Sequence, residues 1–373
     1  MNSTKKLLRF IRIYGLRKTL FKALGRLRSG RFTLAPRSGA DIGVIGAGQF
    51  AFATVGYSIY KRFGNRFVTC FDVDERNART FCKFYGLGGP CASAEELINR
   101  KDVKVVYITS NHASHAGYAL QALFSGKTAY IEKPICVDHD QFRPLVEASR
   151  TFRGRVFAGY NRPFSGALRL LRERCGETDG PMTLSCFVSG HQLGPEHWYR
   201  QPQEGTRICG NVGHWIDLAV HMLCWGRLVD RWSITAAYSS MEHRDDDLAI
   251  NFTSERGDLI NIVLTSRTEP FEGINETINF QQGRVIAKID DFRKITIWNE
   301  HALIRKRFWP KDVGHDLALT QPFHEISRDW SEVERSTLMM LFVKEMIVNG
   351  ERGREFSFVD EWKRLGLTPP EAA

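Results

Sequence analysis

Two short motifs in this sequence contain residue types that suit nucleotide binding and proton transfer. The first is Gly-Val-Ile-Gly-Ala-Gly-Gln-Phe-Ala at residues 43–51, in which an apolar run passes into a glycine-rich turn. The second is Glu132-Lys133-Pro134, which directly follows another apolar run. A glycine-rich turn before a helix can cradle a pyrophosphate, and a lysine beside it can exchange a proton or hold an oxyanion. The two motifs together predict chemistry on a substrate next to a bound nucleotide.

The glycine-rich turn has the residues that a dinucleotide site requires. Gly46 permits the tight turn, and the missing side chain at Gly48 lets a pyrophosphate approach the backbone. The small Ala51 permits close packing of the helix on the strand. We expect Gly46, Gly48, Gln49 and Phe50 to contact the cofactor, because they span the turn and the start of the next helix.

Asp72 ends the next predicted strand, in the segment Phe71-Asp72-Val73-Asp74. A carboxylate at this place can accept hydrogen bonds from an adenosine ribose and would repel a 2′-phosphate. The sequence therefore favours NAD over NADP as the cofactor. We interpret Asp74 as a solvated loop residue.

The elements that must position these residues follow from the apolar periodicity. Up to about residue 159, short apolar strands alternate with helices, which implies a parallel sheet covered on both faces, because parallel neighbours need a crossover helix. The predicted strands are 41–46, 67–72, 103–109, 127–132 and 154–159, and the predicted helices are 49–62, 75–85, 112–125 and 138–151.

From about residue 182 the pattern changes to a meandering, mostly antiparallel sheet, because the apolar runs alternate or are β-branched and short turns join them. A long helix is expected from Pro322 to Val348, ended by Asn349-Gly350. The predicted fold class is α/β. In this second part we expect strands at 182–188, 231–238, 248–253, 259–265, 277–281 and 293–298.

The positive charge is concentrated at the N-terminus. Residues 1–40 contain eleven Lys and Arg and no Asp or Glu, whereas the rest of the chain contains 41 basic and 42 acidic side chains. This neutral body argues against nucleic acid as a partner. Residues 5–28 have helical spacing, and the leader that they form could bind an anionic membrane surface, dock on another protein or subunit, or have no specific role. Its apolar stripe consists of Ile13, Leu16, Leu20, Leu24 and Leu27.

The eight cysteines show no zinc-ligand spacing, so we expect buried, reduced thiols and no metal site. No apolar run approaches the roughly 18 residues that a membrane-spanning helix needs. Basic residues also interrupt every candidate core of a signal peptide. These features predict a cytoplasmic protein.

The motifs resemble those of the glucose-fructose oxidoreductase/inositol dehydrogenase family (Gfo/Idh/MocA), whose members combine a glycine-rich dinucleotide turn with a Glu-Lys-Pro motif. The resemblance covers residues 41 to about 350 and leaves the leader unmatched. It implies an N-terminal Rossmann domain that binds NAD, followed by an α/β domain with a large, mostly antiparallel open sheet. The other similar segments are 108–115, Gly126-Lys127, 159–162 and 214–217.

Domain boundaries and further site residues follow from this resemblance. We expect a leader and linker at 1–38, a Rossmann domain at 39–158, a substrate-binding domain at 159–350 and a C-terminal tail at 351–373. The open sheet commonly makes oligomer contacts in the family, which implies a homodimer or homotetramer. The residues that the resemblance places at NAD are Thr109, Asn111, His115, Glu132 and Lys133.

The family's second catalytic segment reads Asp-x-Gly-x-His, in which the histidine accepts a proton and the aspartate assists it. Here the segment is Gly210-Asn211-Val212-Gly213-His214, so the histidine is kept while Gly210 replaces the aspartate. Either Asn211 takes the orienting role, or His214 acts with Lys133 alone. We interpret His221 as a structural residue.

Members associated with bacterial surface-polysaccharide synthesis are more similar still, in 161–165, 197–198 and 205–210. This similarity implies sugar-nucleotide substrates. Arg162 and Arg207, with Asn161, are the expected substrate anchors, because a guanidinium binds a diphosphate or a carboxylate bidentately. Trp198 could stack on a sugar ring or be buried in a domain core, and we interpret Arg200 as a surface residue.

The leading hypothesis is an NAD-dependent oxidoreductase that acts at a secondary hydroxyl of a sugar, nucleotide-linked and used in surface-glycan synthesis. His214 would accept the hydroxyl proton, and Lys133 would hold the developing oxyanion. A second hypothesis is an enzyme that recycles tightly bound NAD within one turnover, as a glycosidase or a sugar–sugar oxidoreductase. A third is a non-catalytic sensing or scaffold subunit. Membrane binding by residues 1–38 would place the protein at the inner face of the membrane.

Overall fold

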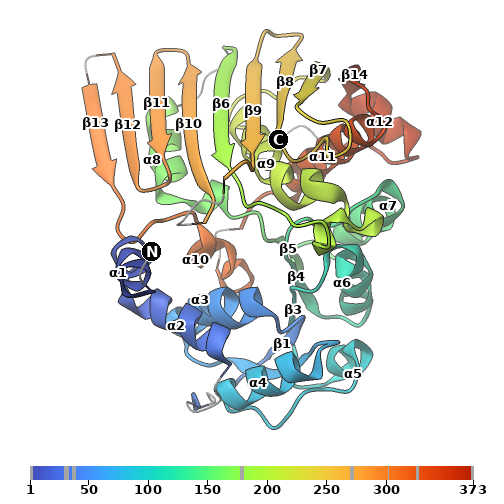
Figure 1. Cartoon of the computed structure of the whole chain (residues 1–373). Coiled ribbons are helices and arrows are strands. Elements are labelled where there is room, and N and C mark those ends of the chain that lie inside the picture. The colour runs from blue at the N-terminus through green and yellow to red at the C-terminus, as the bar shows by residue number, and fades with distance from the viewer. Residues whose placement is uncertain are drawn as a thin grey trace. The chain divides into compact units, whose positions relative to one another are not determined.

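The structure is a computed structural model of the whole chain, and it describes residues 3–28, 33–35, 39–176, 180–268, 273–300, 302–324 and 327–370. The chain forms two compact units (Figure 1). Unit 1 comprises Met1–Cys136, Asp140–Asn161 and His315–Trp330. Unit 2 comprises Val137–His139, Arg162–Gly314 and Ser331–Ala373.

Unit 1 is built on a five-stranded parallel sheet in the order β2-β1-β3-β4-β5. This confirms the predicted parallel sheet, and each predicted strand is present with slightly narrower bounds. The strands are β1 (Ile42–Ile45), β2 (Phe67–Phe71), β3 (Val105–Ile108), β4 (Thr128–Ile131) and β5 (Val156–Ala158). The main helices of this unit are α3 (Gly56–Phe63), α4 (Glu75–Tyr85), α5 (Ala94–Asn99), α6 (His115–Phe124) and α7 (His139–Thr151).

The helix predicted at 49–62 begins differently from an ordinary α-helix. Its first part is a π-helical turn, η1 (Ala51–Val55), which continues into α3. The Tyr85 hydroxyl reaches this turn and donates a hydrogen bond to the Phe52 carbonyl, 2.7 Å away. A Cβ at Gly56 would clash with the same hydroxyl. The inserted hydroxyl explains the wider turn, because a side chain that enters the hydrogen-bond ladder displaces it.

The leader packs on unit 1 as two helices, α1 (Ser3–Tyr14) and α2 (Leu16–Leu27). The expected single helix over 5–28 is wrong, because Gly15 takes a φ of 78° between the two helices. The expected apolar stripe is also divided. Leu24 packs against the core of unit 1, together with Phe21. Leu16, Leu20 and Leu27 are 55%, 51% and 69% exposed.

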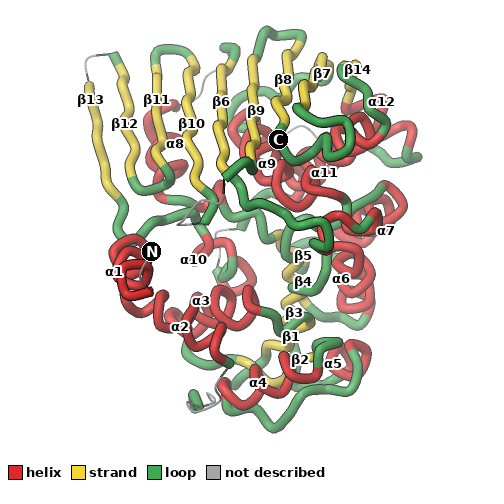
Figure 2. The backbone as a smooth tube through the Cα atoms, in the orientation of Figure 1, coloured by secondary structure: helices red, strands yellow, loops and turns green. Residues whose placement is uncertain are grey.

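Unit 2 contains a nine-stranded sheet in the order β13-β12-β11-β10-β6-β9-β8-β7-β14 (Figure 2). All of its pairings are antiparallel except that of β6 with β9, which confirms the predicted mostly antiparallel sheet. Its strands are β6 (Met182–Ser189), β7 (Arg231–Tyr238), β8 (Leu248–Ser254), β9 (Leu259–Thr265), β10 (Asn275–Gln282), β11 (Val285–Asp290), β12 (Lys294–Asn299), β13 (Ala302–Arg307) and β14 (Gly353–Ser357).

Helices cover one face of this sheet, and α8 (Gly166–Cys175) and α9 (Gly213–Leu223) contact it directly (Figure 1). Burial alternates along strands such as β6 and β8, so their other face is open. The long helix α11 (Trp330–Val348) begins eight residues later than predicted. The short helix α10 (His315–Ala318) belongs to unit 1.

The grouping divides the chain at other positions than the predicted domain boundaries. Residues 3–28 pack with unit 1 and do not form a separate leader. Residues 315–330, predicted to lie in the substrate domain, also belong to unit 1. The expected tail at 351–373 contains β14, which pairs with β7, and α12 (Phe358–Arg364). The sequence pattern missed β14 because the strand Gly-Arg-Glu-Phe-Ser has little apolar alternation.

The described residues contain no helix that is long and apolar enough to cross a membrane. Nor do they contain a cluster of three or more metal-ligating side chains. The eight cysteines are free thiols, and all except the partly exposed Cys224 are buried.

Candidate active site

The predicted cofactor residues of unit 1 follow the ends of its strands in one row. The strand register pairs Ile45 with both Phe71 and Ile108, Ile108 with Ile131, and Ile131 with Ala158. The next residue of each strand therefore lies at the same carboxyl edge of the sheet, which is where parallel sheets bind their ligands. These residues are Gly46, Asp72, Thr109, Glu132 and Gly159.

The glycine-rich turn fits a dinucleotide. Gly46 has a φ of 86°, and a Cβ there would lie 2.5 Å from the Ser110 nitrogen. The Thr109 hydroxyl donates to the Gly46 carbonyl at 2.6 Å and so holds the turn against β3. A Cβ at Gly48 would meet nothing within 4 Å. The backbone at Gly48 is thus open to a pyrophosphate, as the motif predicts.

Asp72 and Asp74 have distinct tasks after β2. Asp72 is half-buried, and its carboxylate accepts a hydrogen bond from the Asp74 backbone nitrogen at 2.8 Å. Asp74 caps α4 by accepting from the backbone nitrogens of Arg76 and Asn77. The interpretation of Asp74 as a solvated loop residue therefore needs correction, because its exposed side chain stabilises a helix N-terminus.

His115 and Asn111 shape the loop after β3. The His115 ring nitrogens lie 2.7 Å from the Pro134 carbonyl oxygen and 3.1 Å from the Ser110 carbonyl oxygen. Its side chain is only 1% exposed, so we interpret it as a residue that holds the loops after β3 and β4 together. The exposed Asn111 accepts hydrogen bonds from the Ser114 hydroxyl.

The Glu-Lys-Pro motif directly follows β4, and its Lys133–Pro134 bond is cis. Burial raises the pKa of Glu132 to about 8, although the charge of Lys133 opposes this shift. One carboxylate oxygen of Glu132 is buried without a hydrogen-bond partner among the described residues. A Cβ at Gly159 would clash with that oxygen. Burial at the sheet edge thus favours the protonated form of Glu132.

In unit 2, His214 and Asn211 lie where a π-helical turn, η6 (Ile208–Val212), continues into α9. π-helical turns are frequent at functional sites. His214 is partly exposed and Asn211 is 9% exposed. No hydrogen bond joins Asn211 to His214 in the described part of the chain. A Cβ at Gly213 would lie 2.5 Å from the Met340 sulfur, so this glycine permits the close packing of α9 on α11.

Arg162, a predicted substrate anchor, forms a buried ion pair. Its guanidinium donates two hydrogen bonds to the Glu276 carboxylate, at 2.7 and 3.0 Å. The Trp215 indole donates to the same carboxylate at 2.8 Å, and the guanidinium stacks over its ring. The anchor role of Arg162 needs correction, because its charge is already neutralised in the core of unit 2. Asn161, its neighbour, is 2% exposed in unit 1.

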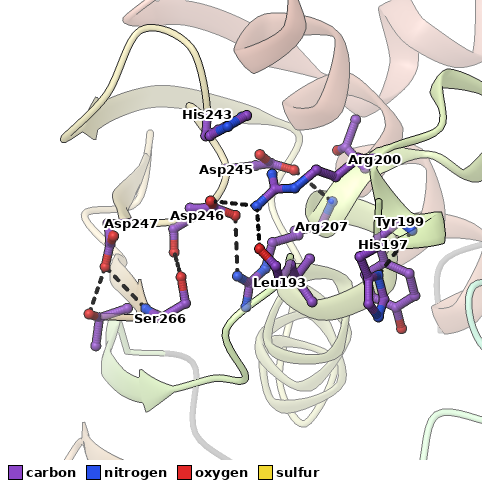
Figure 3. A network of polar contacts seen from close by, with 12 residues as sticks. Leu193, His197, Tyr199, Arg200, Arg207, His243, Asp245, Asp246, Asp247 and Ser266 are labelled. Carbon is purple, nitrogen blue, oxygen red and sulfur yellow. Dashed lines mark hydrogen bonds and ion pairs between the residues drawn. The ribbon is translucent and has the colours of Figure 1, made fainter. Parts of the chain in front are cut away.

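Arg207 also belongs to an internal network of polar contacts (Figure 3). Its side chain is 1% exposed and donates to Asp246 at 3.3 Å. Arg200 binds the other oxygen of Asp246 at 2.9 Å and also donates to the carbonyls of Leu193 and Gly194. The interpretation of Arg200 as a surface residue is therefore wrong. Two buried guanidinium nitrogens of Arg207 lack hydrogen-bond partners in the described part of the chain.

Trp198 stands on the surface of unit 2, in the short turn η4 (Trp198–Arg200), with its side chain 38% exposed. It packs beside His197 and Tyr199. The alternative of a buried core tryptophan is excluded. His221 binds Glu332 at 2.8 Å and accepts from the Trp225 indole at 3.3 Å, in line with a structural role.

Comparison with known proteins shows what this chain resembles. A profile described as the oxidoreductase family with an NAD-binding Rossmann fold, Gfo/Idh/MocA, matches residues 40–160, which are less than half of the chain. An inositol 2-dehydrogenase of Burkholderia lata is 29% identical over 161 residues, which are 42% of this chain and 48% of that protein. An inositol 2-dehydrogenase of Klebsiella pneumoniae is 24% identical over 237 residues, which are 59% of this chain and 66% of that protein. The chain spans about half the length of most curated relatives it matches.

Solved structures share the fold across both units. Levoglucosan dehydrogenase in complex with NADH aligns with a TM-score of 0.70 at 13% identity and covers 85% of this chain and 98% of its own. A dehydrogenase from Clostridium difficile aligns with a TM-score of 0.65 at 15% identity. The alignment covers 83% of this chain and 99% of that protein. At this identity the likeness establishes the architecture alone.

Sequence reasoning missed the acidic partners of these arginines. Glu276 lies on β10 and Asp246 precedes β8, each far in sequence from the arginine it binds. The run Asp245-Asp246-Asp247 was the available signal, because three consecutive aspartates need cationic partners when the loop is partly buried. Glu276 gave no such signal, since it stands alone in a polar strand.

Proposed function

We propose that this protein is an NAD-dependent oxidoreductase that oxidises a secondary hydroxyl group of a sugar. The observation that carries the proposal is the row of residues at the carboxyl edge of the parallel sheet, where Lys133 follows Glu132 on the same edge as the open Gly48 backbone. The inositol 2-dehydrogenase relatives and the levoglucosan dehydrogenase fold neighbour support a sugar or polyol substrate.

The chain's own residues would divide the work of the reaction. Bound NAD supplies the hydride acceptor. The Gly46–Gly48 backbone would hold its pyrophosphate, and the Asp72 carboxylate would accept hydrogen bonds from its adenosine ribose. The Lys133 ammonium would stabilise negative charge on the substrate oxygen, and His214 would accept the hydroxyl proton. Asn211 would orient His214 only if substrate brings the two side chains together.

The finer part of the proposal is a nucleotide sugar used in surface-glycan synthesis. Trp198 supports it, because an exposed indole can stack on a ring. Arg162 and Arg207 do not support it in this arrangement, since both guanidinium groups bind internal carboxylates. If the substrate carries a diphosphate, other cations must bind it, or Arg207 must exchange Asp246 for the phosphate.

We also propose a homo-oligomer that assembles through the open face of the unit 2 sheet. That face exposes large apolar side chains, which single-chain proteins seldom gather in one patch. Phe187, Ile286 and Trp298 are 51%, 47% and 42% exposed. Ile286 and Trp298 also line a cavity of about 330 Å³ on the sheet. Light scattering of Trp298→Ser should show a smaller particle than the wild type, and an unchanged mass would reject this surface.

Association of the leader with the inner face of the membrane is a further part of the proposal. Leu7 and Leu8 on α1 are 49% and 62% exposed, and this helix contains several basic residues. Removing residues 1–14 should abolish sedimentation with anionic vesicles at low salt, because about 1 kcal/mol per basic residue would be lost. Vesicles of neutral lipid are the control. A full-length chain that does not sediment with anionic vesicles would exclude this location.

The decisive experiment for the reaction is a screen of nucleotide sugars, free sugars and inositols with NAD, monitored by the appearance of free NADH. We expect turnover with at least one substrate and loss of turnover in Lys133→Ala. NADH that forms but stays bound would favour the enzyme that recycles its cofactor. Absence of turnover and of NAD binding would favour the non-catalytic subunit.

A further inference from the structure

The end of the leader lies against the glycine-rich turn of unit 1. A Cβ at Gly25 would lie 2.9 Å from the Phe52 ring and 3.1 Å from the Gln49 amide nitrogen. The Gln49 amide donates to the Lys22 carbonyl at 3.2 Å. Helix α2 thus packs on η1, the turn that follows the predicted pyrophosphate cradle, and Gly25 permits this close approach.

Arg28, directly after α2, connects the glycine-rich turn to α4. One nitrogen of its guanidinium donates to the Ala47 carbonyl at 2.8 Å, inside the glycine-rich turn. The other terminal nitrogen donates to the Asn77 carbonyl and to the Thr80 hydroxyl, both at 3.0 Å, in α4. The guanidinium also stacks over the Phe52 ring, 5.0 Å from its centroid.

These contacts join the turn that would hold the pyrophosphate to α4, the helix that directly follows the loop of Asp72 and Asp74. The charges of Asp72 and Asp74 raise the pKa of Arg28 against the larger effect of burial, which lowers it. Arg28 therefore offsets two carboxylates at the edge where an anionic cofactor would bind. Without it, Asp72 and Asp74 would repel the two negative charges of a pyrophosphate.

We propose that the leader is part of the NAD site and that Arg28 is its positioning residue, fixing the glycine-rich turn relative to the Asp72 loop and neutralising that loop. The inference rests on NAD binding by unit 1 and not on the identity of the substrate. It adds a role to those that the sequence left open for the leader, which were membrane binding, docking on another protein or subunit, or no specific role. Residue 28 lies outside the segment that matches the family profile.

The test measures NAD binding to the full-length protein by calorimetry, with no sugar present. Arg28→Ala should weaken NAD binding about tenfold, which corresponds to about 1.4 kcal/mol. Arg26→Ala is the matched control, because Arg26 lies two residues earlier, in α2, with an exposed side chain. The NAD affinity of this variant should differ less than twofold from that of the wild type. Arg28→Lys keeps the charge and loses the fork of donors, so its affinity should lie between those of the wild type and Arg28→Ala.

A second measurement distinguishes a role of Arg28 in positioning and charge from a role in stabilising the fold alone. NADP carries an additional phosphate beside Asp72, so loss of the Arg28 cation should weaken NADP more than NAD. The ratio of the two dissociation constants should therefore rise at least threefold in Arg28→Ala, whereas a merely loosened turn would weaken both cofactors equally. Salt should also weaken NAD binding less in this variant than in the wild type.

Two results would overturn the inference: NAD affinity within twofold of the wild type in Arg28→Ala, or an unchanged ratio of NADP to NAD dissociation constants. If Arg28→Ala does not fold, Arg28→Lys decides, because full wild-type affinity in that variant would remove the positioning role. A wild-type protein that binds NAD but oxidises no sugar would contradict the proposed function and leave this inference intact.

Discussion

Replacing Glu276 with Gln should destabilise unit 2 strongly, because it breaks a buried ion pair while keeping the side-chain shape. The side chains of Arg162 and Glu276 are 6% and 2% exposed. The carboxylate accepts three hydrogen bonds, two from Arg162 and one from the Trp215 indole. A Gln amide offers one oxygen and one NH₂ group, so at least one donor would face another donor beside an uncompensated guanidinium.

The expected loss in the free energy of unfolding is about 3 kcal/mol, the lower end of the range for a broken buried pair, since one acceptor survives in the amide. Urea unfolding followed by tryptophan fluorescence suits this test, because seven of the eight tryptophans lie in unit 2. Glu147→Gln is the control: its partner Arg143 lies 3.2 Å away, both side chains are more than half exposed, and the change should be below about 0.5 kcal/mol.

A loss of less than about 1 kcal/mol in Glu276→Gln would refute this reasoning and return Arg162 to the set of candidate substrate anchors. The double variant Arg162→Met with Glu276→Leu gives an independent check. Apolar replacement of both partners removes the unpaired charge, so it should unfold at a higher urea concentration than Glu276→Gln alone.

Three further predictions concern the proposed cofactor-binding and catalytic residues. Because burial raises the pKa of Glu132 to about 8 in the folded state, the folded protein keeps this proton above pH 4.5 while the unfolded chain releases it. Urea unfolding should therefore show that the wild type loses about 1 kcal/mol or more of stability relative to Glu132→Gln as the pH rises from 4.5 towards 8. Calorimetry should show that the wild type binds NAD at least about tenfold more tightly than NADP, and Asp72→Ser should narrow this difference. Equal affinities of the wild type for the two cofactors would remove the role of Asp72 in cofactor choice. Lys133→Ala and His214→Ala should each lower kcat roughly 10²–10⁴-fold with little change in NAD affinity, and near-normal turnover would reject the proton-transfer scheme.

The sequence was sufficient to predict the edge of the parallel sheet because local rules determine it. Strand ends can be found from apolar runs, and parallel strands place their carboxyl ends together. Gly46, Asp72 and Glu132 therefore fall in one row without any knowledge of tertiary contacts. The cradle at Gly48 is a backbone property, so a motif of small residues predicts it.

The roles of the arginines could not be predicted in the same way. Arg162 and Glu276 are separated by 114 positions, and whether a guanidinium faces solvent or a core carboxylate depends on how β10 pairs within the sheet. An arginine that suits a phosphate suits a buried carboxylate equally well. The residue type therefore correctly indicated that Arg162 binds an acidic group with two hydrogen bonds, but in this structure that group is Glu276 and not a substrate phosphate.

The leader shows why helical spacing alone does not decide which surface an apolar stripe contacts. Its stripe of leucines suits lipid, but Phe21 and Leu24 are covered by the core of unit 1. Its charge is also not all available to a membrane: Arg28 binds the glycine-rich turn, and burial, with repulsion from Arg26 and Lys18, lowers the pKa of Lys22 to about 8. An amphipathic helix next to a folded domain can pack its apolar side against that domain or against lipid, and its hydrophobic periodicity is the same in either case.

Because α2 has a docked side and an exposed side, deleting the whole leader would mix two effects. Loss of residues 1–38 would remove the exposed Leu16 and Leu20 together with the Arg28 contacts, so weaker NAD binding and weaker vesicle binding would appear together. Substitutions separate them. Leu20→Ser should weaken vesicle binding and leave NAD affinity unchanged, whereas Arg28→Lys should do the reverse, since it retains the charge that an anionic leaflet attracts. Two variants that move both properties together would mean that membrane contact and cofactor binding are coupled through α2.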